Sequence, residues 1–390
     1  MTEALRQFNE RRRHVLGGMG DRWRALPRWQ RWLTLLAGVA FLYYLPFLGD
    51  IPGTNLIIPG LDWFRTDSID GGANWAGVLF VCALYVLVAI GLNVVIGLAG
   101  LLDLGYVGFY AVGAYSVALF GSADSPVVGA LQDQFGLSSD WAIAWAICIP
   151  IALAFSLVAG VLLGWPTLRL RGDYLAIVTL GFGEIIRIVA KNSGWAGEAQ
   201  GVPGIPGPEG PPSPDNKVFG LLDIKPWYWL ALSVVLLMVL LVRRLEHSRV
   251  GRSWLAIRED EDAAAVMGVY PFKFKLWAFA IGAALGGFSG LLFASRSAFI
   301  QPETFNVQLS ILFVAMVVVG GSGNMAGVAV GAFLLAYLPE RFRDFSEYRV
   351  LAFGLALVLI MLLRPQGLLP SRRRTRELQD RAKEAPVNVA

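Results

Sequence analysis

Glu184 and Arg187 are opposite charges inside the otherwise uncharged stretch 174–190. Residues three apart lie on one face of a helix, so these two side chains can form an ion pair. A charge within a membrane is costly and marks function by default. We expect a structural ion pair buried in a helix bundle. The alternative is direct contact with a zwitterionic ligand, because a carboxylate binds an ammonium group and a guanidinium binds a carboxylate.

A second concentration of charge lies in the loop 246–275. Four consecutive acids, residues 259–262, precede an alanine run that is followed by Gly268. Acids stabilise the N-terminal end of a helix through its dipole, and glycine is a natural residue just past the C-terminal end. The pattern predicts one short amphipathic helix over residues 254–268, with Ile257, Ala264 and Met267 on one face. A solvated connector is the other interpretation.

The sequence has no set of residues suited to catalysis or to metal binding. His14 and His247 lie outside the apolar stretches, and Cys82 and Cys148 lie within them, so we expect no catalytic triad, disulfide framework or metal site. The chain also lacks the phosphate-binding pattern G-x-x-x-x-G-K-[ST]. We therefore expect no enzyme, no cofactor and no hydrolysis of ATP by this chain.

The elements that must position these residues are membrane helices. The chain has 390 residues, of which 56% are apolar and 16% charged, whereas soluble domains have about 25% charged residues. A bilayer core requires about 20 apolar residues per helix. We expect an all-α integral membrane protein with about ten spans, eight to ten being possible. The predicted spans are 32–49, 74–96, 104–123, 141–164, 174–190, 227–242, 276–295, two short helices within 304–339, and 349–363.

Positive charge is concentrated at both ends of the chain. Residues 1–31 have a net charge of +5 and residues 364–390 a net charge of +4. Basic flanks of apolar segments lie on the cytoplasmic side, so we expect two cytoplasmic tails around a membrane domain at 32–363, and no binding to nucleic acid. The Gly- and Pro-rich segment 192–226 is expected to be extended and external, either as a flexible surface loop or as a docking surface for a partner.

Glycines are concentrated before the third and the ninth predicted spans. Broken helices in corresponding places of two halves indicate a path for a solute near the middle of the membrane. Small residues also allow helices to pack closely, and the two interpretations stay open. The candidates for a solute path are Gly100, Gly105, Gly108, Gly320, Gly321 and Gly323, with Glu184 and Arg187.

Several motifs together resemble a known family. Asp262-Ala263-Ala264 followed by Gly268 is similar to the acid-Ala-Ala-x-x-x-Gly loop of ABC importer permeases, with Asp where Glu is commoner. The further stretches occur in order at 100–109, 168–182, 319–323 and 363–368. As a set they resemble the M-type permeases of high-affinity branched-chain amino acid ABC transporters, over about residues 75–370. Residues 1–70 form a longer N-terminal extension than that pattern requires.

The resemblance implies a role and a set of partners. It implies a permease subunit in a bacterial cytoplasmic membrane, working with a second permease, two cytoplasmic ATP-binding subunits and an external substrate-binding protein. It also implies that the 254–268 helix is a cytoplasmic coupling helix that contacts an ATPase. The residues assigned to this contact are Arg258, Glu259, Asp262, Ala263, Ala264 and Gly268.

Three other functions remain as alternatives. A permease for urea or short-chain amides shares the same general motifs. An ion-coupled secondary transporter would need its own coupling residues, and Glu184, Arg187 and Asp103 are too few for a convincing relay. A membrane-embedded enzyme lacks a catalytic constellation.

Overall fold

The computed structural model describes residues 27–47, 75–136, 138, 141–170, 172–209, 218–219, 224–341 and a few positions near the C-terminus, namely 354–355, 358 and 367–369. The chain divides into two compact units, residues 1–70 and 71–390. The predicted tails therefore lie almost entirely outside the described residues, and so does most of the predicted span 349–363.

In the first unit, the described residues 27–47 form one apolar helix. Helix α2 (Arg28–Tyr44) continues into a 3-10 turn, η1 (Leu45–Phe47). It coincides with the first predicted span, although it begins inside the predicted basic tail 1–31. Its apolar part is shorter than the other candidate spans.

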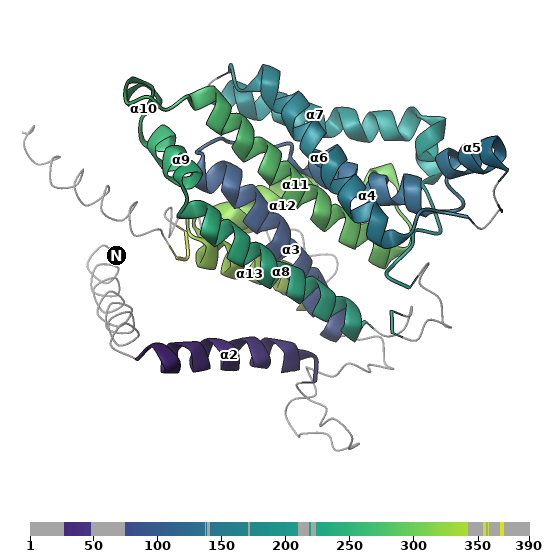
Figure 1. Ribbon diagram of the computed structural model, residues 1–390, viewed down its shortest axis with the longest axis horizontal. Helices are drawn as coiled ribbons and strands as arrows, with labels where there is room; N and C mark the ends of the chain where they lie inside the picture. Colours follow the sequence, from purple (N-terminus) through teal and green to yellow (C-terminus); the bar gives the residue numbers. More distant parts are fainter. Residues whose placement is uncertain are drawn as a thin grey trace, which may run out of the picture. The chain divides into compact units, whose positions relative to one another are not determined.

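The second unit is a bundle of helices (Figure 1). Its described residues form no named β-strand, and Val202 and Ile300 form an isolated antiparallel bridge. The all-helical prediction is thus confirmed. The helices are α3 (Trp75–Asn93), η3 (Val94–Leu98, a π-helix), α4 (Tyr106–Gly121), α5 (Pro126–Phe135), α6 (Trp145–Thr167), α7 (Asp173–Asn192), η4 (Gly194–Ala196), η5 (Glu198–Gln200), α8 (Lys225–Glu246), α9 (Arg249–Glu259), α10 (Glu261–Val266), α11 (Pro271–Ser297), η6 (Pro302–Thr304), α12 (Val307–Gly320) and α13 (Met325–Arg341).

Helices α3, α4 and α11 form the core of this unit. Helix α11 packs against α4, α6 and α3, and α3 also packs against α8 and α13. A Cβ atom on Gly113 of α4 would overlap the backbone of Gly287 of α11, so these two helices meet backbone to backbone. The Tyr106 hydroxyl donates to the carbonyl of Gly282 across the same interface, at 2.8 Å. Glycine therefore provides close packing in the middle of the bundle.

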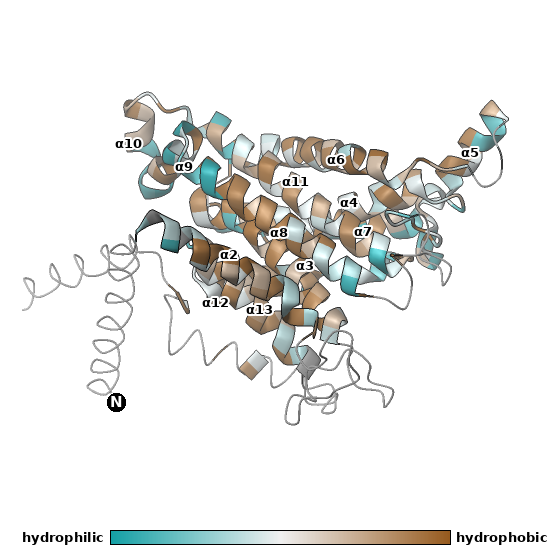
Figure 2. Cartoon of the chain, turned by 60° about the horizontal axis from the view of Figure 1, so that its bottom comes forward, coloured by the Kyte–Doolittle hydropathy of each residue, from teal (hydrophilic) through white to brown (hydrophobic). Residues whose placement is uncertain are grey.

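Six helical segments are long and apolar enough to cross a membrane: 75–98, 106–135, 145–167, 225–246, 271–297 and 302–320. Figure 2 shows hydrophobic residues along α8 and α11, and hydrophilic residues on α9. Helix α7 matches the fifth predicted span in position but is not among the six, and α13 is a shorter apolar helix. The membrane-protein class is supported by six candidate spans, and the number ten stays a prediction.

The segment after α7 is more ordered than predicted. Residues 193–209 contain the two 3-10 turns, and Val202 and Ile205 are buried. The Val202 amide donates to the carbonyl of Ile300, and the Ile205 amide donates to that of Ala298. The interpretation as a flexible surface loop is wrong for this part, because apolar side chains and backbone pairing fix it beside the end of α11.

Candidate functional site

Two helices occupy the charged loop for which one was predicted. Asp260 adopts an extended conformation, with φ −154° and ψ 114°, and separates α9 from α10. Its Oδ1 accepts hydrogen bonds from the amides of Asp262 and Ala263, both at 2.9 Å. Asp260 is therefore the N-cap of α10, and its non-helical backbone ends α9. For this reason the prediction of a single helix over residues 254–268 is wrong. Gly268 follows α10 with φ +85°, as predicted for a C-terminal cap.

Helix α9 is fixed to the bundle by its apolar face. The side chain of Trp254 is fully buried, and its Nε1 donates to the carbonyl of Phe274 in the first turn of α11, at 2.7 Å. Ile257, three residues on, is 5% exposed. A buried indole with a satisfied N–H is a strong anchor. These contacts set the direction in which the next residue, Arg258, projects.

Arg258 contacts the first glycine-rich break. Its Nη1 donates to the carbonyl of Gly97, near the end of the π-helix that continues α3. Its aliphatic stem lies over Gly100, where a Cβ atom would clash with it. Gly100 has φ +73°, a conformation that a residue with a side chain adopts only with strain. Glycine at position 100 is therefore required both by the turn and by the arginine.

The same guanidinium also lies against the second glycine-rich break, between α12 and α13. A Cβ atom on Gly323 would lie 2.8 Å from the Arg258 Nη1. Asn93, at the end of α3, accepts a hydrogen bond from the Gly323 amide at 2.9 Å. Arg258 and Asn93 thus join two chain breaks that are more than 200 residues apart in the sequence.

A short C-terminal stretch completes the second break. Helix α12 ends at Gly320, and its last carbonyls accept hydrogen bonds from the amides of Leu368 and Leu369, at 2.8 and 3.1 Å. The Asn324 side-chain amide donates to the carbonyl of Leu369 at 2.9 Å. Gly321 packs against Gly367. Two motifs that are distant in sequence, 319–323 and 363–368, therefore meet at one helix end.

The remaining glycines of the first break pack on α7. A Cβ atom on Gly105 would overlap the backbone of Thr179, and one on Gly108 would press on Phe182 and Gly183. Thr179 accepts a hydrogen bond from the Leu104 amide at 3.0 Å. Gly320 likewise packs on Gly327. The observed environment of these glycines is close helix packing.

Asp103 is fully buried at the same junction. It lies in the connection between η3 and α4, where one carboxylate oxygen accepts a hydrogen bond from the Gly105 amide at 2.9 Å. The other oxygen has no hydrogen-bond partner among the described residues. Burial raises the pKa of this carboxyl to about 6, and the hydrogen bond from the Gly105 amide acts against that rise.

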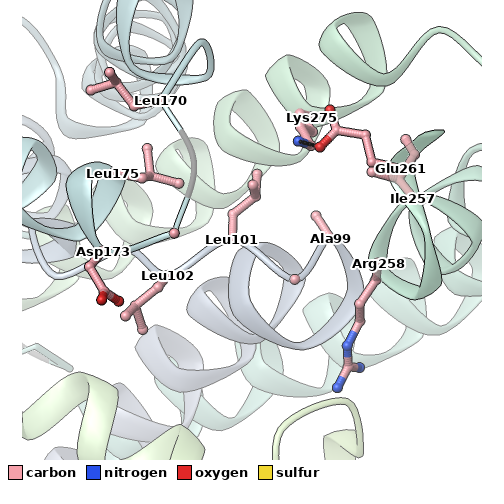
Figure 3. Close-up of a pocket in the computed structure, with 12 residues that line it drawn as sticks. Ala99, Leu101, Leu102, Leu170, Asp173, Leu175, Ile257, Arg258, Glu261 and Lys275 are labelled. Atoms are coloured by element: carbon pink, nitrogen blue, oxygen red, sulfur yellow. Dashed lines mark ion pairs between the residues drawn. The ribbon is translucent and has the colours of Figure 1, made fainter. Parts of the chain in front are cut away.

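Helix α10 has a buried and an exposed face. Ala264 is buried, and Glu261 forms an ion pair with Lys275 of α11 at 2.6 Å. Beside this ion pair lies a cavity of about 280 Å³ (Figure 3). On the outer side, Val266, Met267 and Tyr270 are 88%, 83% and 73% exposed. The prediction that Met267 shares the buried face is wrong, because α10 ends at Val266.

Glu184 and Arg187 do form an ion pair, at 2.5 Å on α7. Their side chains are 32% and 18% exposed, so the prediction of a pair buried inside the bundle is wrong. The amphipathic helix α7 carries the pair on a partly open face. Glu303 of η6 extends it by accepting from Arg187 at 2.8 Å and from Lys191 at 2.6 Å. The cluster therefore ties α7 to the segment that precedes α12.

The structure brings together residues that the sequence left apart. Arg258 meets Gly97, Gly100 and Gly323, and Gly105 and Gly108 meet α7 nearby. The cluster of Glu184 and Arg187 involves a different pair of elements, the end of α7 and η6. Functional candidates that sequence reasoning missed are Asn93, Lys275, Glu303, Leu368 and Leu369. Only Leu368 lay within a quoted motif, and nothing in the local pattern indicated the others.

Sequence similarity to known proteins covers the segments described above. The sequence profile of the family described as "Branched-chain amino acid transport system / permease component" matches residues 74–363. The high-affinity branched-chain amino acid transport system permease protein LivM of Escherichia coli is 38% identical over 91% of this chain and 88% of its own length. The protein of the same description from Salmonella typhimurium is 38% identical over 89% of this chain and 86% of its own length.

More distant relatives differ in their described substrates. The autoinducer 2 import system permease protein LsrC of Yersinia pseudotuberculosis is 25% identical over 59% of this chain and 65% of its own length. No solved structure matches the chain significantly.

Proposed function

We propose that this chain, which belongs to the family of permease components of branched-chain amino acid transport systems, is one membrane subunit of an ATP-driven importer for leucine, isoleucine and valine. The observation that carries the mechanism is the contact of Arg258 with both glycine-rich breaks. Through it, a force applied to α9 and α10 reaches the ends of α3 and α12 directly.

Similarity to permease components of such transport systems supports a set of partners. A second permease, two ATP-binding subunits and an external substrate-binding protein complete the transporter, and the termini of this chain are cytoplasmic. The exposed apolar tip of α10, formed by Val266 and Met267, docks in a cleft of one ATPase. Glu259, Asp262, Ala263 and Gly268 lie on the exposed side of the same unit and belong to that contact. ATP hydrolysis takes place on the partner chains.

The cycle is a conformational one, without covalent chemistry on this chain. Closure of the ATPases displaces α9 and α10, and Arg258 transmits the displacement to the breaks at Gly97–Gly100 and Gly320–Gly323. The glycines at these breaks act as packing and hinge residues beside the solute path. The ion pair of Glu184 and Arg187, extended by Glu303, holds α7 against η6.

Cross-linking tests the docking surface. Cys82 and Cys148 are both buried, so a single exposed cysteine can be labelled selectively. We expect Met267→Cys, with a short cross-linker that carries a maleimide and an amine-reactive ester, to cross-link to lysine side chains of a co-expressed ATP-binding subunit. The matched control is Phe135→Cys in α5, which is 68% exposed and lies on another element. Cross-links from Phe135→Cys alone would contradict the docking proposal.

Uptake into proteoliposomes tests the substrate. The complete transporter, with its external binding protein, is expected to accumulate radiolabelled leucine only when ATP is enclosed. Unlabelled isoleucine and valine should compete, whereas urea and acetamide should not. Competition by urea would favour an amide permease, and uptake without ATP would favour a secondary carrier.

A further inference from the structure

The cavity beside α9 and α10 has the size of a site for a small metabolite. It is a half-open cavity lined by the connection 99–102, the start of α7, the α9–α10 unit and the beginning of α11 (Figure 3). Its volume of about 280 Å³ is just below the roughly 300–1,000 Å³ of pockets that hold drug-sized ligands. Leu101, Leu175 and Ile257 contribute apolar walls. A ligand of a few heavy atoms with an aliphatic part fits this cavity.

One wall of the cavity carries both signs of charge. Lys275 is only 8% exposed, and its Nζ contacts Oε2 of Glu261, as the dashed line in Figure 3 shows. An ammonium group has three donors, and a carboxylate accepts at both oxygens. Among the described residues, Glu261 is the one ion-pair partner of Lys275. The pair thus retains donors and acceptors for a ligand that has a carboxylate and an ammonium group of its own.

We propose that this cavity binds a small aliphatic α-amino acid. The carboxylate of the ligand binds Lys275, its ammonium group binds Glu261, and its side chain lies against Leu101 and Ile257. The inference rests on the proposed function, because the ligand is then the transported product on the side where it is released. It adds a regulatory site to the transporter.

Occupancy of the cavity has a mechanical consequence. The ligand would lie between the α9–α10 unit and the connection 99–102, next to the stem of Arg258, which is also part of the wall. A filled cavity holds these segments apart and prevents the movement that Arg258 transmits. A ligand that binds one conformation more tightly than the other shifts the population toward it. The amino acid on the cytoplasmic side therefore slows its own import.

The test measures uptake of leucine into proteoliposomes whose lumen already contains leucine. Proteoliposomes with the complete transporter contain ATP and unlabelled leucine, and radiolabelled leucine with the external binding protein is supplied outside. The initial rate of uptake is expected to fall as luminal leucine rises. Isocaproate, which lacks the ammonium group, and isoamylamine, which lacks the carboxylate, are the control probes and are expected to leave the rate unchanged.

Filling the cavity gives the decisive variant. Leu170 lines the cavity and is 39% exposed, so Leu170→Trp occupies the space without entering the core. The matched control is Leu162→Trp, which is 67% exposed on α6 and does not line the cavity. Leu170→Trp is expected to import leucine more slowly than the wild type even into an empty lumen, because the indole holds the segments apart as a bound ligand would, and to show no further inhibition by luminal leucine. Leu162→Trp keeps that inhibition.

A second measurement is independent of transport. Leucine is expected to raise the melting temperature of the purified complete transporter, and the increase shrinks in Leu170→Trp but not in Leu162→Trp. Equal increases in both variants, equal inhibition of both, or inhibition by isocaproate as strong as that by leucine would overturn the proposal. Failure of the wild-type transporter to import leucine into an empty lumen would instead contradict the proposed function, and the melting temperatures would still decide whether the cavity binds leucine.

Discussion

The α9–α10 unit and the charged cluster on α7 use the same kind of side chain in opposite ways. The guanidinium of Arg258 donates a hydrogen bond to a backbone carbonyl, at a place where two chain breaks meet. The guanidinium of Arg187 forms ion pairs with the carboxylates of Glu184 and Glu303 on a partly exposed face. The first arrangement links segments that are distant in sequence through one side chain. The second arrangement is a network of ion pairs on the surface of the unit.

The energetic consequences differ accordingly. A hydrogen bond from a charged group to a partly buried acceptor contributes about 1.5–3 kcal/mol, and its loss leaves the acceptor unsatisfied. Exposed ion pairs contribute about 0–1 kcal/mol, because water and salt screen them. Glu184 and Arg187 are prominent in the sequence because they lie inside an apolar stretch. Arg258 lies outside the apolar stretches, yet it contacts both glycine-rich breaks. Position in the sequence alone does not rank charged residues.

Replacement of Arg258 should give the largest effect. Arg258→Ala removes the contact with Gly97 and leaves that carbonyl without its donor. We expect ATP-driven uptake to fall by about 10- to 100-fold, which corresponds to the loss of one charge-assisted hydrogen bond. The control is Arg252→Ala on the exposed face of α9, where uptake should stay near wild type. Equal losses in the two variants would remove the distinction between the two faces of α9.

Asp103 should make the stability of the junction depend on pH. Its pKa in the folded protein, about 6, lies above the ordinary value of 3.8. The folded state therefore binds more protons, and stability is greatest at low pH and falls as pH rises through 6. The full loss above pH 7 is about 3 kcal/mol. Asp103→Asn should remove this dependence and raise the melting temperature more at pH 7.5 than at pH 5. An unchanged pH profile would show that the carboxylate has a partner.

Two glycine-to-alanine changes separate packing from helix propensity. Gly113→Ala places a methyl group against the backbone of Gly287 and should destabilise the protein by about 1–3 kcal/mol. Gly129→Ala in α5 has open space around it and should stabilise the helix by up to about 1 kcal/mol. Thermal melts in detergent measure both. Stabilisation by Gly113→Ala would argue against close contact between α4 and α11.

Removal of the exposed pair should give the smallest effect. Glu184→Gln keeps the shape of the side chain, and Arg187 retains Glu303 as a partner. We expect a change in unfolding free energy of no more than about 1 kcal/mol, with normal assembly. Impaired assembly would restore the interpretation of a buried structural pair, and a change confined to the affinity for the solute would favour direct contact with the ligand.

Local patterns predicted the helices better than their contacts. Each apolar stretch between 32 and 339 coincides with a helix, because length and hydrophobicity determine such segments locally. The break at Asp260 was missed, since an acid in a run of acids is equally compatible with the first turn of a helix. The pairing of Leu368 and Leu369 with the end of α12 depends on tertiary structure. The role of Lys275 and the meeting of both glycine breaks at Arg258 depend on it as well.

Hydrogen exchange of the complete transporter tests the central claim most directly. Exchange would be measured by mass spectrometry, with and without a non-hydrolysable ATP analogue, in wild type and in Arg258→Ala. The account predicts that the analogue changes protection of α10 and of the peptides spanning 97–105 and 320–324 in the wild type. In Arg258→Ala the change should be confined to α10. Unchanged protection of both breaks in the wild type, or the same change in both proteins, would contradict transmission through Arg258.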